Sequence, residues 1–270
     1  MTEMARKRRW ERFVDRASGK ALIVPMDHGL TFGPIPGLNR TDDVLRWLTP
    51  EVVTGVVLHK GYAERLGGVP GCGLMIHLNG ALGWGDTPDV KHRVTSVEAA
   101  LRLGADAVSV QTDFLPATAS HNLRLVGEVV DEAHAYGVPV LAMVYDKSPV
   151  VEGALGRLRH VMRAMVELGI DVLKVTAPAD LSNIPELIDG IQPHTPVLFA
   201  GGALVEEQAL MELGSAVVRY GAGGMCVGRN VFQRANPRAT MERLLQLLRA
   251  GMPALDFKRL ASIGPAEMVR

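Results

Sequence analysis

Ionisable side chains end several short apolar runs of this chain, and one of them is a lysine. Lys174 interrupts the run 171–177, whose other residues suit a buried strand. Burial disfavours the charged form of lysine and lowers its pKa, and a neutral amine can attack a carbonyl to form a Schiff base. We therefore predict that Lys174 is a nucleophile, although such a lysine can also turn outward and keep its amine in water. Lys60 ends another run and is a competing nucleophile, an electrostatic partner or a solvated strand end.

A carboxylate and a phenol end two further runs. Asp27 follows the run Leu-Ile-Val-Pro-Met, and Tyr145 follows Val-Leu-Ala-Met-Val. A carboxylate at such a place can move protons or bind a substrate hydroxyl, and it can also simply accept bonds from loop amides. Tyrosine at a strand end is often a core residue with a solvated hydroxyl. Asp27 and Tyr145 are candidate acid–base groups beside Lys174.

Histidines end three successive runs and raise the question of a metal site. His28, His59 and His77 could bind zinc from adjacent strands, but their spacing matches no metal motif. Asp27 and His28 are neighbours, so only one of them points into the fold. We predict no metal and no other cofactor, and we place His28 and Lys60 among the candidate substrate-binding residues. Gln111 and Asp113 also end a run, without an assigned role.

The elements that position these residues follow one repeated pattern. A short apolar run precedes a longer amphipathic one eight times, the apolar runs being 21–28, 53–60, 73–78, 107–113, 139–146, 172–177, 196–202 and 224–230. Runs that are apolar on both faces suit parallel strands covered on both sides, and the helical runs 122–136, 155–168 and 204–220 end at glycine. Eight strand–helix units predict an α/β fold, a single (β/α)8 TIM barrel. The alternative is a doubly wound sheet, but the sequence lacks the G-x-G-x-x-G fingerprint of a dinucleotide-binding sheet after the first run.

Glycines follow the last two predicted strands of the barrel. Gly201 and Gly202 follow the seventh strand, and Gly228 and Arg229 follow the eighth. Barrels often bind phosphate with these two loops, because glycine lets backbone amides approach the oxygens and arginine adds a bidentate charge. These four residues are candidate phosphate ligands, with a pair of tight turns as the alternative. The interval 79–96, which has no predicted strand, is a candidate active-site loop or lid.

The composition limits the partners and the cellular compartment that we expect for this chain. The chain has 270 residues, 47% of them hydrophobic, and 29 basic against 29 acidic residues. This balance gives no general field for nucleic acid or membrane, and two cysteines without a CxxC pair favour a reducing cytoplasm. We expect one domain over 1–270, with an N-terminal helical extension at 1–20 and a C-terminal tail at 251–270. We also expect a homo-oligomer with small-molecule substrates.

Several motifs resemble one known family over nearly the whole chain, from about residue 9 to 250. They are Val-Pro-Met-Asp-His-Gly at 24–29, Gly-Pro-Ile-Pro-Gly-Leu at 33–38, Leu-His-Lys-Gly at 58–61, Gly-Leu-Met-Ile-His-Leu at 73–78 and Met-Val-Tyr at 143–145. The chain resembles the Schiff-base class I aldolases of the archaeal fructose-bisphosphate aldolase type, most closely the 2-amino-3,7-dideoxy-D-threo-hept-6-ulosonate synthase branch. The resemblance implies that Lys174 is the Schiff-base lysine, Tyr145 the proton-transfer residue and Asp27 an assisting carboxylate. It also implies that Gly201, Gly202, Gly228 and Arg229 hold phosphate.

Three loops depart from the family pattern. Asp-Lys-Ser at 146–148 replaces Pro-Arg-Gly, 175–179 replaces the usual Tyr-Thr-Gly segment, and Ala-Leu at 203–204 replaces Pro-Lys. These loops contact substrate in the family, so the acceptor and the donor can differ from those of characterised members.

The sequence therefore predicts a metal-independent class I aldolase or transaldolase. It would join or cleave a phosphorylated ketose or dihydroxyacetone phosphate and an aldehyde, in the synthase case aspartate semialdehyde. The first alternative is a class I fructose-1,6-bisphosphate aldolase. An alternative of another class is a non-catalytic sugar-phosphate-binding barrel, against which the combination of Lys174, Tyr145 and Asp27 argues.

Overall fold

Parallel strands close into a barrel in the computed structural model, which describes residues 2–67, 71–149 and 153–250. The barrel strands are β2 (Lys20–Pro25), β3 (Gly55–Leu58), β4 (Gly73–His77), β7 (Ala107–Phe114), β8 (Val140–Asp146), β9 (Val172–Thr176), β10 (Val197–Ala200) and β11 (Gly224–Cys226). Neighbours pair in parallel, and β2 closes the ring by pairing with both β11 and β3. The predicted (β/α)8 barrel is confirmed.

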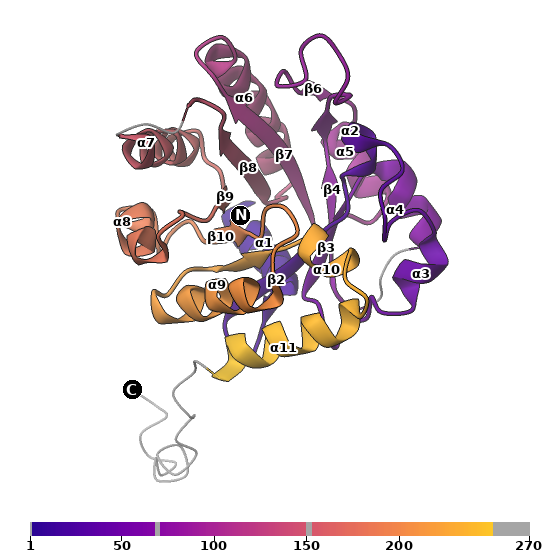
Figure 1. Ribbon diagram of the computed structural model, residues 1–270. Coiled ribbons are helices and arrows are strands. Elements are labelled where there is room, and N and C mark those ends of the chain that lie inside the picture. The colour runs from indigo at the N-terminus through magenta and orange to yellow at the C-terminus, as the bar shows by residue number, and fades with distance from the viewer. Residues whose placement is uncertain (1, 68–70, 150–152, 251–270) are drawn as a thin grey trace, which may run out of the picture.

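Helices surround this ring and separate consecutive strands (Figure 1). They are α2 (Gly29–Phe32), α3 (Thr41–Leu45), α4 (Lys60–Leu66), α5 (Val97–Arg102), α6 (Ala119–Ala135), α7 (Ala154–Glu167), η2 (Leu181–Asn183), α8 (Ile184–Ile188), α9 (Glu207–Arg219), α10 (Arg229–Phe232) and α11 (Pro237–Ala250). Their apolar faces pack against the outer side of the strands, which is why the strands are apolar on both faces. In the described part of the chain, no helix is long and apolar enough to cross a membrane.

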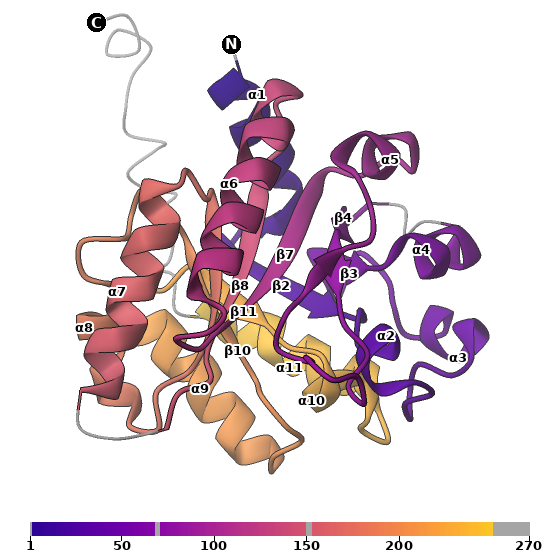
Figure 2. The same cartoon turned by 90° about the horizontal axis from the view of Figure 1, so that it is seen from above.

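The N-terminal segment covers the end of the barrel where the strands begin. It contains α1 (Thr2–Trp10), η1 (Glu11–Phe13) and the short strand β1 (Val14–Asp15), which pairs antiparallel with β2. Phe13 is fully buried, and a Cβ added at Gly55 or Gly73 would lie only 2.3 or 2.6 Å from its ring. Figure 2 shows α1 at one end of the barrel and α2 and α10 at the other. The predicted extension is therefore not wholly helical, and the predicted tail 251–270 lies outside the described residues.

The interval 79–96 is not free of strands, contrary to the sequence prediction. It contains the antiparallel pair β5 (Asn79–Gly80) and β6 (His92–Arg93). Two-residue strands are too short to leave an alternating pattern, so no local signal predicts them. Arg93 forms an ion pair with Glu132 on α6, which fixes the end of this interval against the barrel wall.

Alternation along the strands decides which side chains face the barrel interior. The inner core consists of Phe13, Ala21, Ile23, Val57, Met75, Ala107, Leu141, Met143, Val172, Leu198 and Cys226. Successive side chains of a strand point to opposite faces, so residues two apart share a face. Tyr145 stands two residues after Met143, and Lys174 two residues after Val172, so both face inward at the carboxyl ends of their strands.

Candidate active site

One cavity at the carboxyl ends of the strands gathers most of the predicted site residues. Its volume is about 310 Å³. The side chains around it are Asp27, His28, Thr31, Phe32, Pro88, Asp89, Lys91, Gln111, Asp113, Met143, Tyr145, Lys147, Lys174 and Arg229. A larger cavity of about 580 Å³ between the segment 29–39 and α4 shares Asp27 with it, but Lys174 does not line that one. The smaller cavity is therefore the candidate active site.

Lys174 lies inside the barrel on β9, with only 5% of its surface exposed. Its Nζ lies 3.5 Å from the Met143 sulfur on β8. Burial opposes protonation of this amine, but interactions with the neighbouring Cys226, Tyr145 and Asp27 outweigh that effect and raise the pKa of Lys174 above its usual range. The predicted inward position is what the structure has. The predicted lowering of the pKa is wrong, because it considered burial and not these neighbours.

Asp27 lies between two histidines at the end of β2. Its Oδ1 is 3.8 Å from His28 Nδ1, and its Oδ2 is 3.7 Å from His77 Nε2. Burial opposes ionisation of Asp27, but attraction to His77, His28 and Lys174 prevails and lowers its pKa to about 2. Burial also lowers the pKa of His77 to about 3 and that of His28 below its ordinary value. Asp27 is therefore a carboxylate at neutral pH, flanked by neutral imidazoles.

His77 is held from the opposite side by the adjacent strand. Its Nδ1 lies 2.8 Å from the Ser109 hydroxyl on β7, so its Nε2 faces Asp27. His59 stacks edge-on against His77 with ring centroids 5.2 Å apart. Among the described residues, no group of three His, Cys, Asp or Glu side chains is placed to hold a metal ion. The three histidines instead build the surroundings of Asp27.

Tyr145 stands beside Lys174 at the end of β8. Burial raises its pKa above 10, and the nearby Lys174 ammonium only partly offsets that rise. The Lys147 ammonium lies 5.9 Å from the centre of the Tyr145 ring. The hydroxyl is therefore neutral at physiological pH and can donate or accept a proton at a bound substrate.

Of the four predicted phosphate ligands, Arg229 alone lines the cavity, and its buried Nε has no hydrogen-bond partner among the described residues. Gly202 has a left-handed backbone with φ of +69°, which suits a tight turn. A Cβ at Gly228 would lie 2.7 Å from the Pro25 carbonyl oxygen, so packing against β2 explains this glycine. Gly201 sits beside Asn230, where a Cβ would lie 3.1 Å from the Asn230 Nδ2.

Asn230, a residue without a predicted role, joins the two glycine loops. Its Nδ2 donates to the carbonyls of Gly201 and Ala203 at 2.9 and 2.7 Å, and its Oδ1 accepts from the Val205 amide at 2.9 Å. The side chain is fully buried. Asn230 therefore fixes the loop after β10 to the helix that carries Arg229.

Lys60 takes no part in this cavity. It begins α4, is exposed, and donates from its ammonium to the Val94 carbonyl at 2.9 Å. This position matches one of the three alternatives for Lys60, the solvated strand end. Lys60 therefore does not compete with Lys174 for a substrate in the cavity.

Comparisons with known proteins agree with this geometry. A family model described as DeoC/LacD family aldolase matches residues 21–234. The chain belongs to the DeoC/LacD aldolase family. It is 31% identical to the 2-amino-3,7-dideoxy-D-threo-hept-6-ulosonate synthase 1 of Archaeoglobus fulgidus, over 92% of this chain and 93% of that protein. It is also 30% identical to the 2-amino-4,5-dihydroxy-6-oxo-7-(phosphonooxy)heptanoate synthase of Streptomyces griseus, over 90% of each.

A solved structure extends the comparison to the covalent chemistry. An archaeal fructose-1,6-bisphosphate aldolase, with its catalytic lysine covalently bound to the carbinolamine intermediate, is 26% identical to this aldolase with a TM-score of 0.80. The match covers 90% of this chain and 98% of that one. The resemblance drawn from the motifs is therefore confirmed, and the protein is a Schiff-base class I aldolase, an enzyme rather than a non-catalytic barrel.

The departures from the family pattern occupy different places around the aldolase site. Asp146 turns away from the cavity and pairs with Arg157 on α7 at 3.0 Å. Lys147, the next residue, lines the cavity. Thr176 ends β9 exposed, and Leu204 is 49% exposed. Among these changes, Lys147 is the one placed to meet a substrate.

Proposed function

We propose that this aldolase joins a phosphorylated ketone donor to an amino-acid aldehyde through a Schiff base on Lys174. The observation that carries the proposal is the buried Lys174 amine in a cavity shared with Tyr145 and Asp27. In this proposal the donor is dihydroxyacetone phosphate or a phosphorylated ketose, and the acceptor is aspartate semialdehyde. The covalent Schiff base replaces any cofactor. The homo-oligomeric state of the protein and its cytoplasmic location stay predictions.

The donor carbonyl reacts first. The Lys174 ammonium must release its proton before the amine can attack, because only the neutral amine is a nucleophile. Loss of water from the carbinolamine gives an iminium ion, which withdraws electrons from the adjacent carbon. Asp27, a carboxylate beside this cation, stabilises it and assists the proton transfers. An enamine forms when that carbon loses a proton, or when its bond to a departing aldehyde breaks.

The acceptor reacts second. The enamine carbon attacks the aldehyde, and the neutral Tyr145 hydroxyl protonates the oxygen that develops negative charge. Water then hydrolyses the new iminium ion and releases the product from Lys174. In the cleavage direction Tyr145 takes the same proton from the substrate hydroxyl.

The proposed acceptor comes from the relatives' names. Addition of dihydroxyacetone phosphate to aspartate semialdehyde gives a seven-carbon 2-amino-4,5-dihydroxy-6-oxo-7-phosphonooxy acid, the compound in the name of the Streptomyces griseus relative. The runner-up acceptor is glyceraldehyde 3-phosphate, supported by the archaeal fructose-bisphosphate aldolase structures. The relatives with at least 30% identity favour the amino-acid aldehyde.

The reaction itself is tested by product analysis. Incubation of the enzyme with dihydroxyacetone phosphate and aspartate semialdehyde is expected to give a product with the summed mass of both, read by mass spectrometry. Parallel reactions replace the acceptor by glyceraldehyde 3-phosphate, or the donor by fructose 1,6-bisphosphate. Formation of fructose 1,6-bisphosphate alone would establish the runner-up instead, and no product with any pair would refute the proposed function.

Removal of the Arg229 guanidinium is expected to weaken donor binding. Arg229→Ala should raise the KM for the phosphorylated donor. The expected rise corresponds to a loss of about 1.5–3 kcal/mol of binding free energy, the range for a charge-assisted hydrogen bond. The unpartnered Nε at the cavity wall is the reason to place the phosphate there. Steady-state kinetics measure the change, and Arg219→Ala, at the end of α9, is the control. An unchanged KM would move the phosphate to Lys91 or Lys147.

A further inference from the structure

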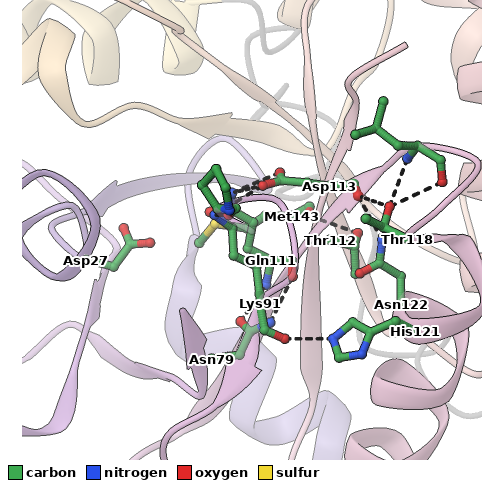
Figure 3. A network of polar contacts seen from close by, with 12 residues as sticks. Asp27, Asn79, Lys91, Gln111, Thr112, Asp113, Thr118, His121, Asn122 and Met143 are labelled. Atoms are coloured by element: carbon green, nitrogen blue, oxygen red, sulfur yellow. Dashed lines mark hydrogen bonds and ion pairs between the residues drawn. The ribbon is translucent and has the colours of Figure 1, made fainter. Parts of the chain in front are cut away.

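A second charged cluster lines the same cavity and takes no part in the steps above. Lys91 Nζ lies 3.2 Å from Asp113 Oδ2, and the two side chains are only 5% and 1% exposed. Gln111 donates from Nε2 to both Asp113 oxygens, at 2.9 and 3.1 Å. Figure 3 shows this network, with Asp27 set apart from it. All three side chains border the space that Lys174 reaches.

Other residues hold this cluster from behind. Asn79 exchanges two hydrogen bonds of 2.8 Å with the backbone of Gln111. The Asp113 carbonyl accepts from Thr118 at 2.6 Å and from Asn122 at 2.9 Å (Figure 3). The backbone of Gln111 and Asp113 is therefore held from behind, and their side chains hydrogen-bond one another at the cavity, which is how binding sites are preorganised.

The order of the strands places this cluster opposite Arg229, the candidate phosphate ligand. Around the barrel, β7 lies four strands from β11, whichever way the ring is followed. Asp113 lies near the end of β7, and Arg229 follows β11. Lys174 on β9 lies midway between them, and Tyr145 on β8 lies between Lys174 and Asp113. A donor with its phosphate at Arg229 and its carbonyl at Lys174 therefore directs its new bond toward Tyr145 and Asp113.

The charges of this wall match a group that carries both signs. Asp113 and Asp89 supply two carboxylates, and Lys91 and Lys147 supply two ammonium groups. A phosphate dianion at this wall would face Asp113, whereas an α-amino acid end brings one ammonium and one carboxylate. A buried ion pair is also a weak stabiliser of a fold, because desolvation offsets its attraction. Fold stability therefore gives little reason to bury Lys91 and Asp113 here.

We propose that Asp113, Gln111 and Lys91 form the subsite for the α-amino acid end of the acceptor aldehyde. The substrate ammonium binds Asp113, which Gln111 orients, and the substrate carboxylate binds Lys91. The two residues exchange their mutual ion pair for these contacts, and no covalent step is involved. This inference rests on the proposed function and assigns its acceptor specificity to three residues.

The test compares two acceptors that differ only at the amino group. Wild-type enzyme is expected to use aspartate semialdehyde better than succinate semialdehyde, which lacks the ammonium. Asp113→Asn should lower kcat/KM for aspartate semialdehyde by about tenfold to a hundredfold and leave the succinate analogue within about threefold. The double variant Lys91→Met with Asp113→Asn leaves no buried charge unpaired. It should lose the preference and also react more slowly with both acceptors, since each carries a carboxylate.

The control distinguishes recognition of the acceptor by Asp113 and Lys91 from a merely structural role, in which their ion pair anchors the 79–96 segment. Glu132→Gln breaks the Arg93 ion pair that fixes this segment elsewhere, and it should leave the preference unchanged. Borohydride trapping of dihydroxyacetone phosphate is measured for every variant to confirm an intact donor site. Equal losses with both aldehydes in Asp113→Asn, with trapping intact, would overturn the inference. A wild-type preference for glyceraldehyde 3-phosphate would also overturn it, whereas absence of wild-type trapping would refute the proposed function itself.

Discussion

Replacement of Lys174 by alanine is expected to abolish turnover, with a fall in kcat of about 10⁴-fold or more, as for other nucleophile removals. The reason is that no other amine on the described cavity wall faces the barrel interior: Lys91 is paired with Asp113, and Lys147 is exposed. Wild-type enzyme incubated with dihydroxyacetone phosphate and borohydride should carry the reduced adduct on the peptide that contains Lys174, as read by mass spectrometry.

Lys174→Arg separates the nucleophile from its charge. Arginine keeps a cation beside Asp27 but does not form a Schiff base, so this variant should fold, bind the donor and fail to trap it. An adduct on Lys60, together with activity in Lys174→Ala, would contradict the assignment. Because Lys60 is exposed and its ammonium donates a hydrogen bond to the Val94 carbonyl, the structure gives no reason to expect that outcome.

The barrel and the inward position of Lys174 were both predictable from local patterns. Strands that are apolar on both faces leave short continuous apolar runs, and a lone lysine within such a run is conspicuous. Short elements are different: β5 and β6 have two residues each and exist only because they pair with one another. No local pattern encodes that pairing, so the interval 79–96 was predicted without strands.

The polar cluster shows where spacing stops being informative. Gln111 and Asp113 were visible as polar residues at a strand end, but their partner Lys91 lies in the long interval before β7. Which cation reaches Asp113 depends on the path of that interval, and this path is a tertiary property. Asn230 was visible as the polar residue that ends the last apolar run, but its hydrogen bonds to the Gly201 and Ala203 carbonyls, 29 and 27 positions away, were not.

The pKa of Lys174 failed as a prediction for a related reason. Burial follows from the apolar run 171–177, and burial alone lowers the pKa of a lysine. The opposing contributions come from Cys226 on β11, Tyr145 on β8 and Asp27, which lies just after β2. Their convergence on one amine is set by barrel closure. The consequence for catalysis is that the free enzyme holds an ammonium, and proton release precedes Schiff-base formation.

Removal of the Tyr145 hydroxyl is expected to separate Schiff-base formation from carbon–carbon bond chemistry. Tyr145→Phe keeps the ring volume, so the fold should survive with little loss of stability. The variant should still be trapped on Lys174 by borohydride, because the amine and the donor site are unchanged. Turnover should fall by about a hundredfold or more, which is the usual contribution of a positioned acid–base group. Single-turnover trapping and steady-state assays on the same samples measure the two steps separately.

The matched control is Tyr136→Phe, since Tyr136 is 51% exposed at the end of α6 and does not line the cavity. Near wild-type turnover of Tyr145→Phe would move the proton transfer to Asp27, which also lines the cavity. Asp146 is a weaker substitute, because it points outward and pairs with Arg157. Loss of trapping together with turnover would place the Tyr145 hydroxyl in Schiff-base formation instead. It would then act on the Lys174 ammonium before the acceptor binds, and the order of steps proposed above would be wrong.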